Sequence, residues 1–343
     1  MSVTAAIYGF AGTEITPEEK AFFRDADPWG FVLFARNIDR PRQVARLAGS
    51  LRDMMGRDVP ILIDQEGGRV QRLKPPTWRK APAARRFGEL YEREPELGIE
   101  AVRLNHEMLA HELITLGIDV DAAPCCDLVV EGADAVIGDR AFSPDPQTVG
   151  MLALAALEGL HRQGVAGIVK HIPGHGRADA DSHFELPVVR EEHGLLSETD
   201  FAPFRAVAGA EMAMTAHVVY ADIDEEHCAT LSREVISNVI RTEIGFDGLL
   251  MSDDLSMKAL RGTIRQRGEG ALKAGCDMLL HCNGDMKEMI EVAHAAVRLD
   301  GKAAERAQKA GAARGRPAGL DLEDARRRLD AYFREAGLEA LAG

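Results

Sequence analysis

Eight short apolar runs, with helix-like segments between most of them, constrain the fold of this chain more than any other feature. Six of the runs end in an acid, a lysine or a histidine. The residues that follow these six runs are Asp64, Asp121, Lys170 with His171, His217, Asp253 and His281. Buried parallel strands have short apolar sequences, and the active sites of (β/α)8 barrels lie at the C-terminal ends of the strands. The pattern therefore predicts an α/β fold, a TIM-type (β/α)8 barrel, with its titratable residues gathered on the catalytic face.

The length of the chain fits one domain of this kind. A (β/α)8 barrel takes about 250 residues, and the chain has 343 residues. We predict a single catalytic barrel domain over residues 1–343, with residues 300–343 forming C-terminal helices packed on the barrel. Long loops after barrel strands usually carry function. The other expected elements are strands at 3–10 and 30–35, helices at 17–25, 41–55, 95–116, 145–162, 231–244, 269–274 and 286–298, and long loops at 65–94, 122–144 and 172–198.

Composition limits the class of partner. The formal net charge is −14, whereas nucleic acids and anionic membrane surfaces bind basic patches. No stretch approaches the roughly 20 apolar residues of a membrane span, and the N-terminal residues lack the pattern of a secretory signal. The five cysteines include no CxxC pair, which favours reduced thiols over a disulfide framework or a zinc ribbon. We therefore expect a cytoplasmic monomer that binds a small molecule and neither nucleic acid nor a membrane.

One loop concentrates histidines and aspartates directly after a strand end. It reads Lys-His-Ile-Pro-Gly-His-Gly from Lys170 and continues to Asp181-Ser182-His183. A carboxylate two residues from an imidazole can hydrogen-bond it, orient it and stabilise its protonated form, so His183 is a candidate general acid/base. Two other interpretations stay open, a solvated polar loop and a metal site, which needs three or four converging ligands. The potential metal ligands are His171, His175, Asp179, Asp181 and His183.

Two further strand ends carry carboxylates whose roles the pattern leaves open. Asp253 and Asp254 follow one strand directly. Adjacent residues of an extended chain point in opposite directions, so one carboxylate can face the barrel mouth while the other caps a helix. Asp64 is followed by a loop with several arginines. It therefore either forms a structural salt bridge or accepts hydrogen bonds from sugar hydroxyls.

Five segments together resemble a known enzyme family. The stretch KHIPGHGRADADSHFELP resembles a loop of family 3 glycoside hydrolases of the β-N-acetylglucosaminidase type, whose pattern is K-H-[FI]-P-G-[HN]-G-x4-D-[ST]-H. The segments IDQEGGRVQR, IGDRAF, MTAHV and MSDDLSM match the same family in the same order. The match runs over nearly the whole chain, and the short length resembles the single-domain members that act in peptidoglycan recycling.

The resemblance implies a role for each matching residue. Asp253, the first acid of Ser-Asp-Asp, corresponds to the nucleophile, and Asp181 and His183 correspond to an acid/base dyad. The resemblance implies neither a metal nor an organic cofactor. The residues that it implies as ligands of the N-acetylglucosamine unit are Asp64, Arg72, Arg140, Lys170 and His171.

The activity that the resemblance implies is that of a retaining exo-β-N-acetylglucosaminidase. Such an enzyme removes terminal β-linked N-acetylglucosamine from peptidoglycan fragments, N-acetylglucosaminyl-β-1,4-(1,6-anhydro)-N-acetylmuramic acid and its peptide forms (muropeptides), through a covalent glycosyl-aspartate. Two alternatives within the family are a broader enzyme that also cleaves β-glucosides and a phosphorylase, because a neutral histidine base does not repel phosphate. Alternatives from other classes are a non-catalytic sugar-binding barrel and a divalent-metal hydrolase.

Overall fold

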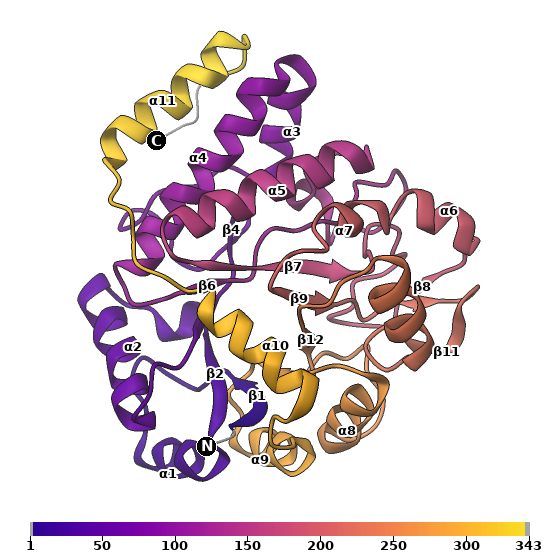
Figure 1. The fold of residues 1–343 in the computed structure, drawn as a ribbon. Helices are drawn as coiled ribbons and strands as arrows, with labels where there is room; N and C mark the ends of the chain where they lie inside the picture. Colours follow the sequence, from indigo (N-terminus) through magenta and orange to yellow (C-terminus); the bar gives the residue numbers. More distant parts are fainter. Residues whose placement is uncertain (1–2, 340–343) are drawn as a thin grey trace.

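The computed structural model describes residues 3–339 and contains a closed barrel of eight strands (Figure 1). All neighbouring strands are parallel, in the order β1-β13-β12-β9-β7-β6-β3-β2. Each strand overlaps one of the eight apolar runs, which confirms the predicted α/β barrel. The strands are β1 (Thr4–Tyr8), β2 (Pro28–Leu33), β3 (Ile61–Ile63), β6 (Val120–Asp121), β7 (Ala166–Ile172), β9 (Met212–Thr215), β12 (Leu249–Asp254) and β13 (Met278–His281).

Four barrel strands continue past their apolar runs into polar residues, and two of them, β7 and β12, do so for at least two residues. β7 includes Lys170 and His171, and β12 includes Asp253 and Asp254. The backbone of both extensions stays paired with a neighbouring strand. These polar side chains are therefore fixed on regular backbone at the C-terminal edge of the barrel, where a rigid scaffold favours precise positioning.

Helices surround the barrel (Figure 1). Local capping fixes where several begin: the Thr16 hydroxyl accepts from Glu19 N at the start of α1, and the Asp145 carboxylate accepts from Thr148 N at the start of α5. None of the helices within residues 3–339 has the length and apolar character that a membrane span requires. The helices are α1 (Pro17–Ala26), α2 (Pro41–Met55), α3 (Ala84–Arg93), α4 (Pro95–Ile114), α5 (Pro146–Arg162), α6 (His193–Glu198), α7 (Ala202–Ala206), η3 (Val235–Glu243), α8 (Ile264–Ala274), α9 (Met286–Ala295), α10 (Gly301–Ala312) and α11 (Leu322–Glu335).

Some helices differ from the prediction in type or extent. The helix predicted at 231–244 is a π-helix, η3, which an apolar pattern of helical period does not distinguish from an α-helix. α8 begins before the predicted 269–274, because the Thr263 side chain accepts from Gln266 N in a capping box. α9 ends before the predicted residue 298.

The segments expected as long loops contain short elements of their own. The first of them, 65–94, holds a hairpin and α3, so the prediction of a loop over its whole length is wrong. Strands of two or three residues carry too little sequence period to be recognised. A small sheet pairs β8 with β10 and β10 with β11, outside the barrel. The short elements within the expected loops are β4 (Gln65–Gly67), β5 (Val70–Gln71), η2 (Gly138–Arg140) and β8 (Val188–Val189). Three others lie outside those segments: η1 (Ala35–Asn37), β10 (Val219–Tyr220) and β11 (Asp224–Cys228).

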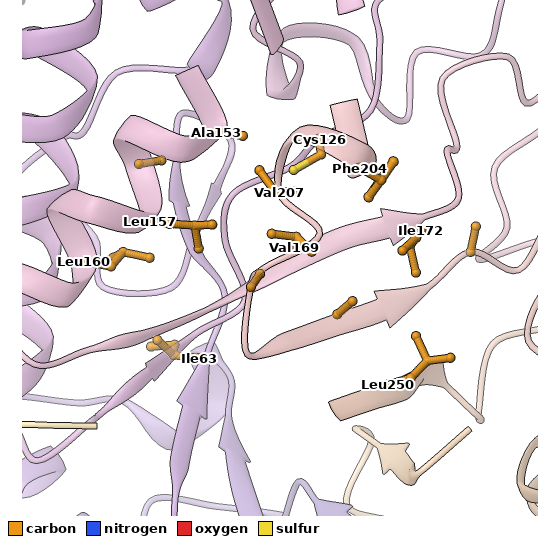
Figure 2. Close-up of a cluster of buried hydrophobic side chains, with 14 of the residues drawn as sticks. Ile63, Cys126, Ala153, Leu157, Leu160, Val169, Ile172, Phe204, Val207 and Leu250 are labelled. Carbon is orange, nitrogen blue, oxygen red and sulfur yellow. The ribbon is translucent and has the colours of Figure 1, made fainter. Parts of the chain in front are cut away.

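The core has two layers, one inside the barrel and one between the barrel and the helices. Figure 2 shows the outer layer, where Leu157 and Leu160 of α5 lie against β7 near Val169. A Cβ placed on Gly167 of β7 would lie 2.5 Å from Leu157 Cδ2, so glycine at this position permits the close packing of the helix on the strand. Burial of both strand faces explains why the strands have apolar rather than alternating sequences.

α10 lies across the N-terminal end of the barrel, opposite the predicted catalytic face. Ala307 packs with the apolar side chains inside the barrel. Arg306 forms ion pairs with Asp247 and Asp277, which precede β12 and β13. α11 packs instead on α4 and α3. The polar pocket described next therefore opens at the other end of the barrel.

Candidate active site

A pocket of about 340 Å³ lies at the C-terminal ends of the barrel strands. A larger hollow, of about 540 Å³, lies between residues 75–82 and α11, and none of the predicted site residues lines it. Seven of the eight predicted site residues line the smaller pocket, and the eighth, Asp181, is hydrogen-bonded to one of them. The seven are Asp64, Arg72, Arg140, Lys170, His171, His183 and Asp253.

A chain of ion pairs forms one wall of the pocket. Lys170 Nζ lies 2.9 Å from Asp64 Oδ1 and 2.7 Å from Glu66 Oε1. Asp64 also pairs with Arg72 Nη2 at 3.0 Å, and Glu66 accepts two hydrogen bonds of 2.9 Å from Arg140. The sequence left open whether Asp64 pairs with cations or meets a sugar. The structure shows the ion pairs and places the same carboxylate in the pocket lining.

These neighbours keep the network ionised. Burial alone would raise the pKa of Asp64, but the charges of Lys170 and Arg72 outweigh it and hold that pKa well below its usual range. In the same way Arg140 and Lys170 overcome burial and lower the pKa of Glu66 to about 2. The two carboxylates raise the pKa of Lys170 against the effect of its own burial. Glu66 was not among the predicted site residues. Its position two residues after Asp64 could have indicated it, because alternate residues of an extended segment point to the same side.

Asp121 lies beneath this network and is a different kind of carboxylate. Its Oδ1 accepts a hydrogen bond of 2.9 Å from Gln65 N, and its Oδ2 is buried without a hydrogen-bond partner among residues 3–339. Burial, reinforced by the negative charges of Asp64 and Glu66, raises the pKa of Asp121 to about 7. It does not line the pocket, so it is a structural group.

The two acids at the end of β12 have unequal surroundings. Asp254 accepts hydrogen bonds from Ser256 N, Ser256 Oγ and Cys282 N at 3.0, 2.6 and 3.0 Å, so its carboxylate organises the following turn. Asp253 Oδ1 accepts from Asp254 N at 2.7 Å, and no hydrogen bond from residues 3–339 reaches Asp253 Oδ2. Burial alone would raise the pKa of Asp253, but the imidazoles of His217 and His171 lower it. Asp253 thus offers an ionised oxygen to the pocket.

Asp181 and His183 form the predicted carboxylate–imidazole pair. His183 Nδ1 lies 2.7 Å from Asp181 Oδ1, and the same oxygen accepts from His183 N at 2.9 Å. Burial alone would raise the pKa of Asp181, but its hydrogen bonds to His183 lower it. The His183 side chain is 62% exposed and lines the pocket together with Asp253. Because Nδ1 is engaged, Nε2 is the nitrogen available for proton exchange.

Asp127 holds the start of the histidine loop in place. Its Oδ2 lies 2.7 Å from His171 Nδ1, and its Oδ1 accepts from His175 N at 2.6 Å. His175 Nε2 in turn lies 3.1 Å from Ser182 Oγ, which joins the barrel edge to the dyad loop. Burial, followed by the charge of His171, lowers the pKa of His175 to about 4. Asp127 was not among the predicted site residues, because its partners lie more than 40 residues away in sequence.

The metal ligands considered in the sequence do not converge. His171 and His175 bind Asp127, His183 pairs with Asp181, and Asp179 Oδ1 accepts from Val188 N. Within residues 3–339 the only group of three potential ligand atoms close enough to share an ion contains His171 with Cys125 and Asp127. A catalytic metal on the histidine loop therefore lacks a ligand set.

Comparison with known proteins gives consistent results. The glycosyl hydrolase family 3 N-terminal domain matches residues 10–314, which contain every predicted site residue. A β-hexosaminidase of Bordetella avium is 38% identical over 277 residues, covering 80% of this chain and 79% of the relative. Native NagZ from Neisseria gonorrhoeae has a TM-score of 0.85 and 31% identity, covering 99% of both chains. The same NagZ in complex with N-trifluoroacetyl-D-glucosamine has a TM-score of 0.84.

Proposed function

This chain belongs to glycosyl hydrolase family 3, and on that basis we propose that it is a retaining exo-β-N-acetylglucosaminidase that acts on peptidoglycan fragments. That it is a β-hexosaminidase of the NagZ type follows from its relatives. One observation carries the finer proposal: the pocket presents the ionised Asp253 carboxylate together with the Asp181–His183 pair. Retaining glycosidases need a nucleophile and a separate proton donor, and these residues supply both.

In the first proposed step Asp253 acts as nucleophile. Its free oxygen forms a bond to C1 of the N-acetylglucosamine unit while the bond from C1 to the glycosidic oxygen breaks. Protonated His183 gives its Nε2 proton to that oxygen, so the leaving sugar departs as a neutral alcohol. Asp181 accepts the hydrogen bond from Nδ1 and steadies the imidazolium. The products of this step are a glycosyl-Asp253 ester and neutral His183.

In the second step water replaces the aspartate. Neutral His183 removes a proton from the water as its oxygen attacks C1, and the ester bond to Asp253 breaks. Histidine regains its proton, aspartate regains its charge, and two inversions at C1 give net retention. An imidazole suits both steps because it titrates near neutrality. Neither step calls on a metal or an organic cofactor.

The residues of the ion-pair wall bind the sugar in this proposal. Ionised Asp64 can accept hydrogen bonds from two hydroxyls, while Arg72 and Lys170 hold its orientation. His171 and Arg140 line the same pocket. A fixed array of donors and acceptors positions C1 over Asp253 and lowers the entropic part of the barrier.

The proposed natural substrate is N-acetylglucosaminyl-β-1,4-(1,6-anhydro)-N-acetylmuramic acid with or without its peptide, and the proposed location is the cytoplasm, where the enzyme would act as a monomer. The pocket volume of about 340 Å³ suits one terminal sugar, in agreement with exo action. The similarity to a NagZ that binds a glucosamine derivative supports the sugar class.

The experiment that tests the proposal is a panel of nitrophenyl β-glycosides together with the anhydro-disaccharide, with and without phosphate. We expect hydrolysis of the N-acetylglucosaminide and the disaccharide, with the β-anomer released first by NMR. A 2-fluoro or 5-fluoro glycosyl inactivator should label Asp253, and Asp253→Asn should lose several orders of magnitude in kcat. Inversion of the anomer, a label on Asp254, or a glucoside hydrolysed in preference would overturn the proposal.

A further inference from the structure

A second cluster of reactive side chains touches the pocket from behind. The Cys125 thiol donates to Asp127 Oδ2 at 3.2 Å, and His171 Nδ1 lies 2.7 Å from the same oxygen. The three potential ligand atoms all lie within 4.8 Å of one another. Cys125, Asp127 and His171 are 3%, 1% and 7% exposed. In the proposed reaction His171 binds the sugar, whereas the Cys125 thiol has no role.

Thiolate, imidazole and carboxylate are the donor types that zinc-class ions prefer. Such an ion binds sulfur at about 2.3 Å and nitrogen or oxygen at about 2.0–2.2 Å in tetrahedral geometry, which separates the ligand atoms by roughly 3.2–3.7 Å. The present separations, between 2.7 and 4.8 Å, bracket that range, so small side-chain rotations suffice. The three residues supply three ligands, and a water would complete the tetrahedral set.

We propose that Cys125, Asp127 and His171 form an inhibitory binding site for a thiophilic divalent cation such as Zn²⁺. The ion replaces the two protons that Asp127 Oδ2 now accepts. The Cys125 proton leaves to solvent and the thiolate binds the ion, while the proton on His171 Nδ1 moves to Nε2 so that Nδ1 binds the ion. Asp127 contributes Oδ2, and its Oδ1 continues to accept from His175 N.

Occupation of this site interferes with sugar binding. The ion replaces the hydrogen bond from His171 to Asp127 and re-aims the imidazole that faces the pocket. With one proton released to solvent, the ion also adds one net positive charge beside a wall whose three cations already outnumber its two carboxylates. Inhibition rests on the proposed function, whereas binding of the ion rests only on the geometry of the three residues, so the two are measured separately.

The neighbouring thiol provides a matched control. Cys126 is also buried, but its Sγ lies 3.8 Å from Pro124 O and its side chain points into the helix-side core near Val207 and Phe204 (Figure 2). Cys126→Ser should therefore leave the site intact. In Cys125→Ser the hydroxyl can still donate to Asp127, so orientation of His171 is retained while the soft ligand is lost.

The binding test uses metal-free full-length protein titrated with Co²⁺ and then with Zn²⁺. Wild type and Cys126→Ser should show an intense thiolate-to-cobalt charge-transfer band at one ion per chain, displaced by Zn²⁺. Cys125→Ser should lose the band and bind Zn²⁺ at least ~10- to 100-fold more weakly, in line with the loss of a metal-site residue. Cys125→Ala gives the same test if the serine variant does not fold.

The activity test measures Zn²⁺ inhibition of nitrophenyl N-acetylglucosaminide hydrolysis, with N-acetylglucosamine present as a competing ligand in a parallel series. Wild type and Cys126→Ser should be inhibited, and Cys125→Ser should resist. A cobalt–thiolate band that survives in Cys125→Ser, or Zn²⁺ binding that is lost in His183→Ala, would overturn the proposal by placing the ion elsewhere. Failure of the chain to hydrolyse the aryl sugar would count against the proposed function and leave the binding result valid.

Discussion

Lys170→Met tests whether the ion-pair wall is a structural and functional unit. Lys170 is 2% exposed, and its ammonium bridges Asp64 and Glu66. Methionine matches the length of the lysine stem and removes the charge. The two carboxylates, of which Asp64 lines the pocket, then have one cation fewer between them, while Arg72 and Arg140 still pair with one carboxylate each.

The magnitude follows from these remaining contacts. Removing one partner of a buried ion pair usually costs about 3–5 kcal/mol. Because each carboxylate keeps an arginine, we expect the lower end, about 3 kcal/mol of unfolding free energy at pH 7. Asp64 and Glu66 have depressed pKa values in the folded protein, so the stability they contribute is present above about pH 4–5 and is lost as the pH falls towards 2. The difference in unfolding free energy between wild type and Lys170→Met should therefore become smaller as the pH falls through this range.

Urea denaturation followed by circular dichroism at pH 7 and at about pH 3, inside that range, measures this prediction, with kcat/KM on a nitrophenyl N-acetylglucosaminide as the functional readout. Lys20→Met on the exposed face of α1 is the matched control, and should change stability by less than about 0.5 kcal/mol. Lys170→Met should also lower kcat/KM, because Asp64 loses part of its orientation. A loss below about 1 kcal/mol, or a gap that does not shrink in acid, would refute the reasoning.

Three further outcomes follow from the geometry. His183→Ala should lower kcat/KM by about 10²- to 10⁴-fold on the disaccharide and far less on a nitrophenyl glycoside, whose leaving group needs no proton; equal losses would assign His183 a binding role. The raised pKa of Asp121, about 7 against an unfolded value near 4, means that its contribution to stability is present in acid and lost as the pH rises through 7. Asp121→Asn should therefore be more stable than wild type at pH 8, by up to ~4 kcal/mol, and the difference should vanish near pH 4 in urea titrations. EDTA should leave activity unchanged or slightly higher, and a loss that Zn²⁺ restores would contradict the metal-free mechanism.

The barrel was predictable because its strands are buried on both faces. The runs are mostly apolar until the barrel mouth, and the acids Asp119 and Asp277 stand just before the strands β6 and β13 begin, so the change from apolar to titratable residues at the end of a run marks the strand end. Helix starts at proline after a capping residue, as at Asp145, were also visible in the sequence. The two-residue strands that pair beside the histidine loop were not, since their pairing depends on residues far away in the chain.

Position at a strand end did not by itself identify a pocket residue. Asp121, His217 and His281 have the same sequence signal as Asp64 and Asp253. In the structure His217 is held between Thr230 Oγ1 and Asp254 O, and His281 bonds Glu288. Whether a side chain faces the barrel mouth depends on strand register to a single residue. The groups that hydrogen-bond such a side chain lie in other parts of the chain, so the strand's own sequence does not reveal them. The resemblance of the motifs, rather than the strand ends alone, separated Asp253 from Asp254.

The two halves of the proposed chemistry rest on supports of different rigidity. Asp253 is part of the β12 ladder, whereas His183 stands on a loop joined to the barrel through the His175–Ser182 hydrogen bond and is 62% exposed. A carboxylic acid that must stay protonated at neutral pH needs burial to raise its pKa, which an exposed loop cannot provide. An imidazole titrates near neutrality in water and needs only orientation, which Asp181 supplies. An Asp–His pair therefore allows the proton donor to lie on a solvent-exposed loop while the nucleophile stays on the barrel.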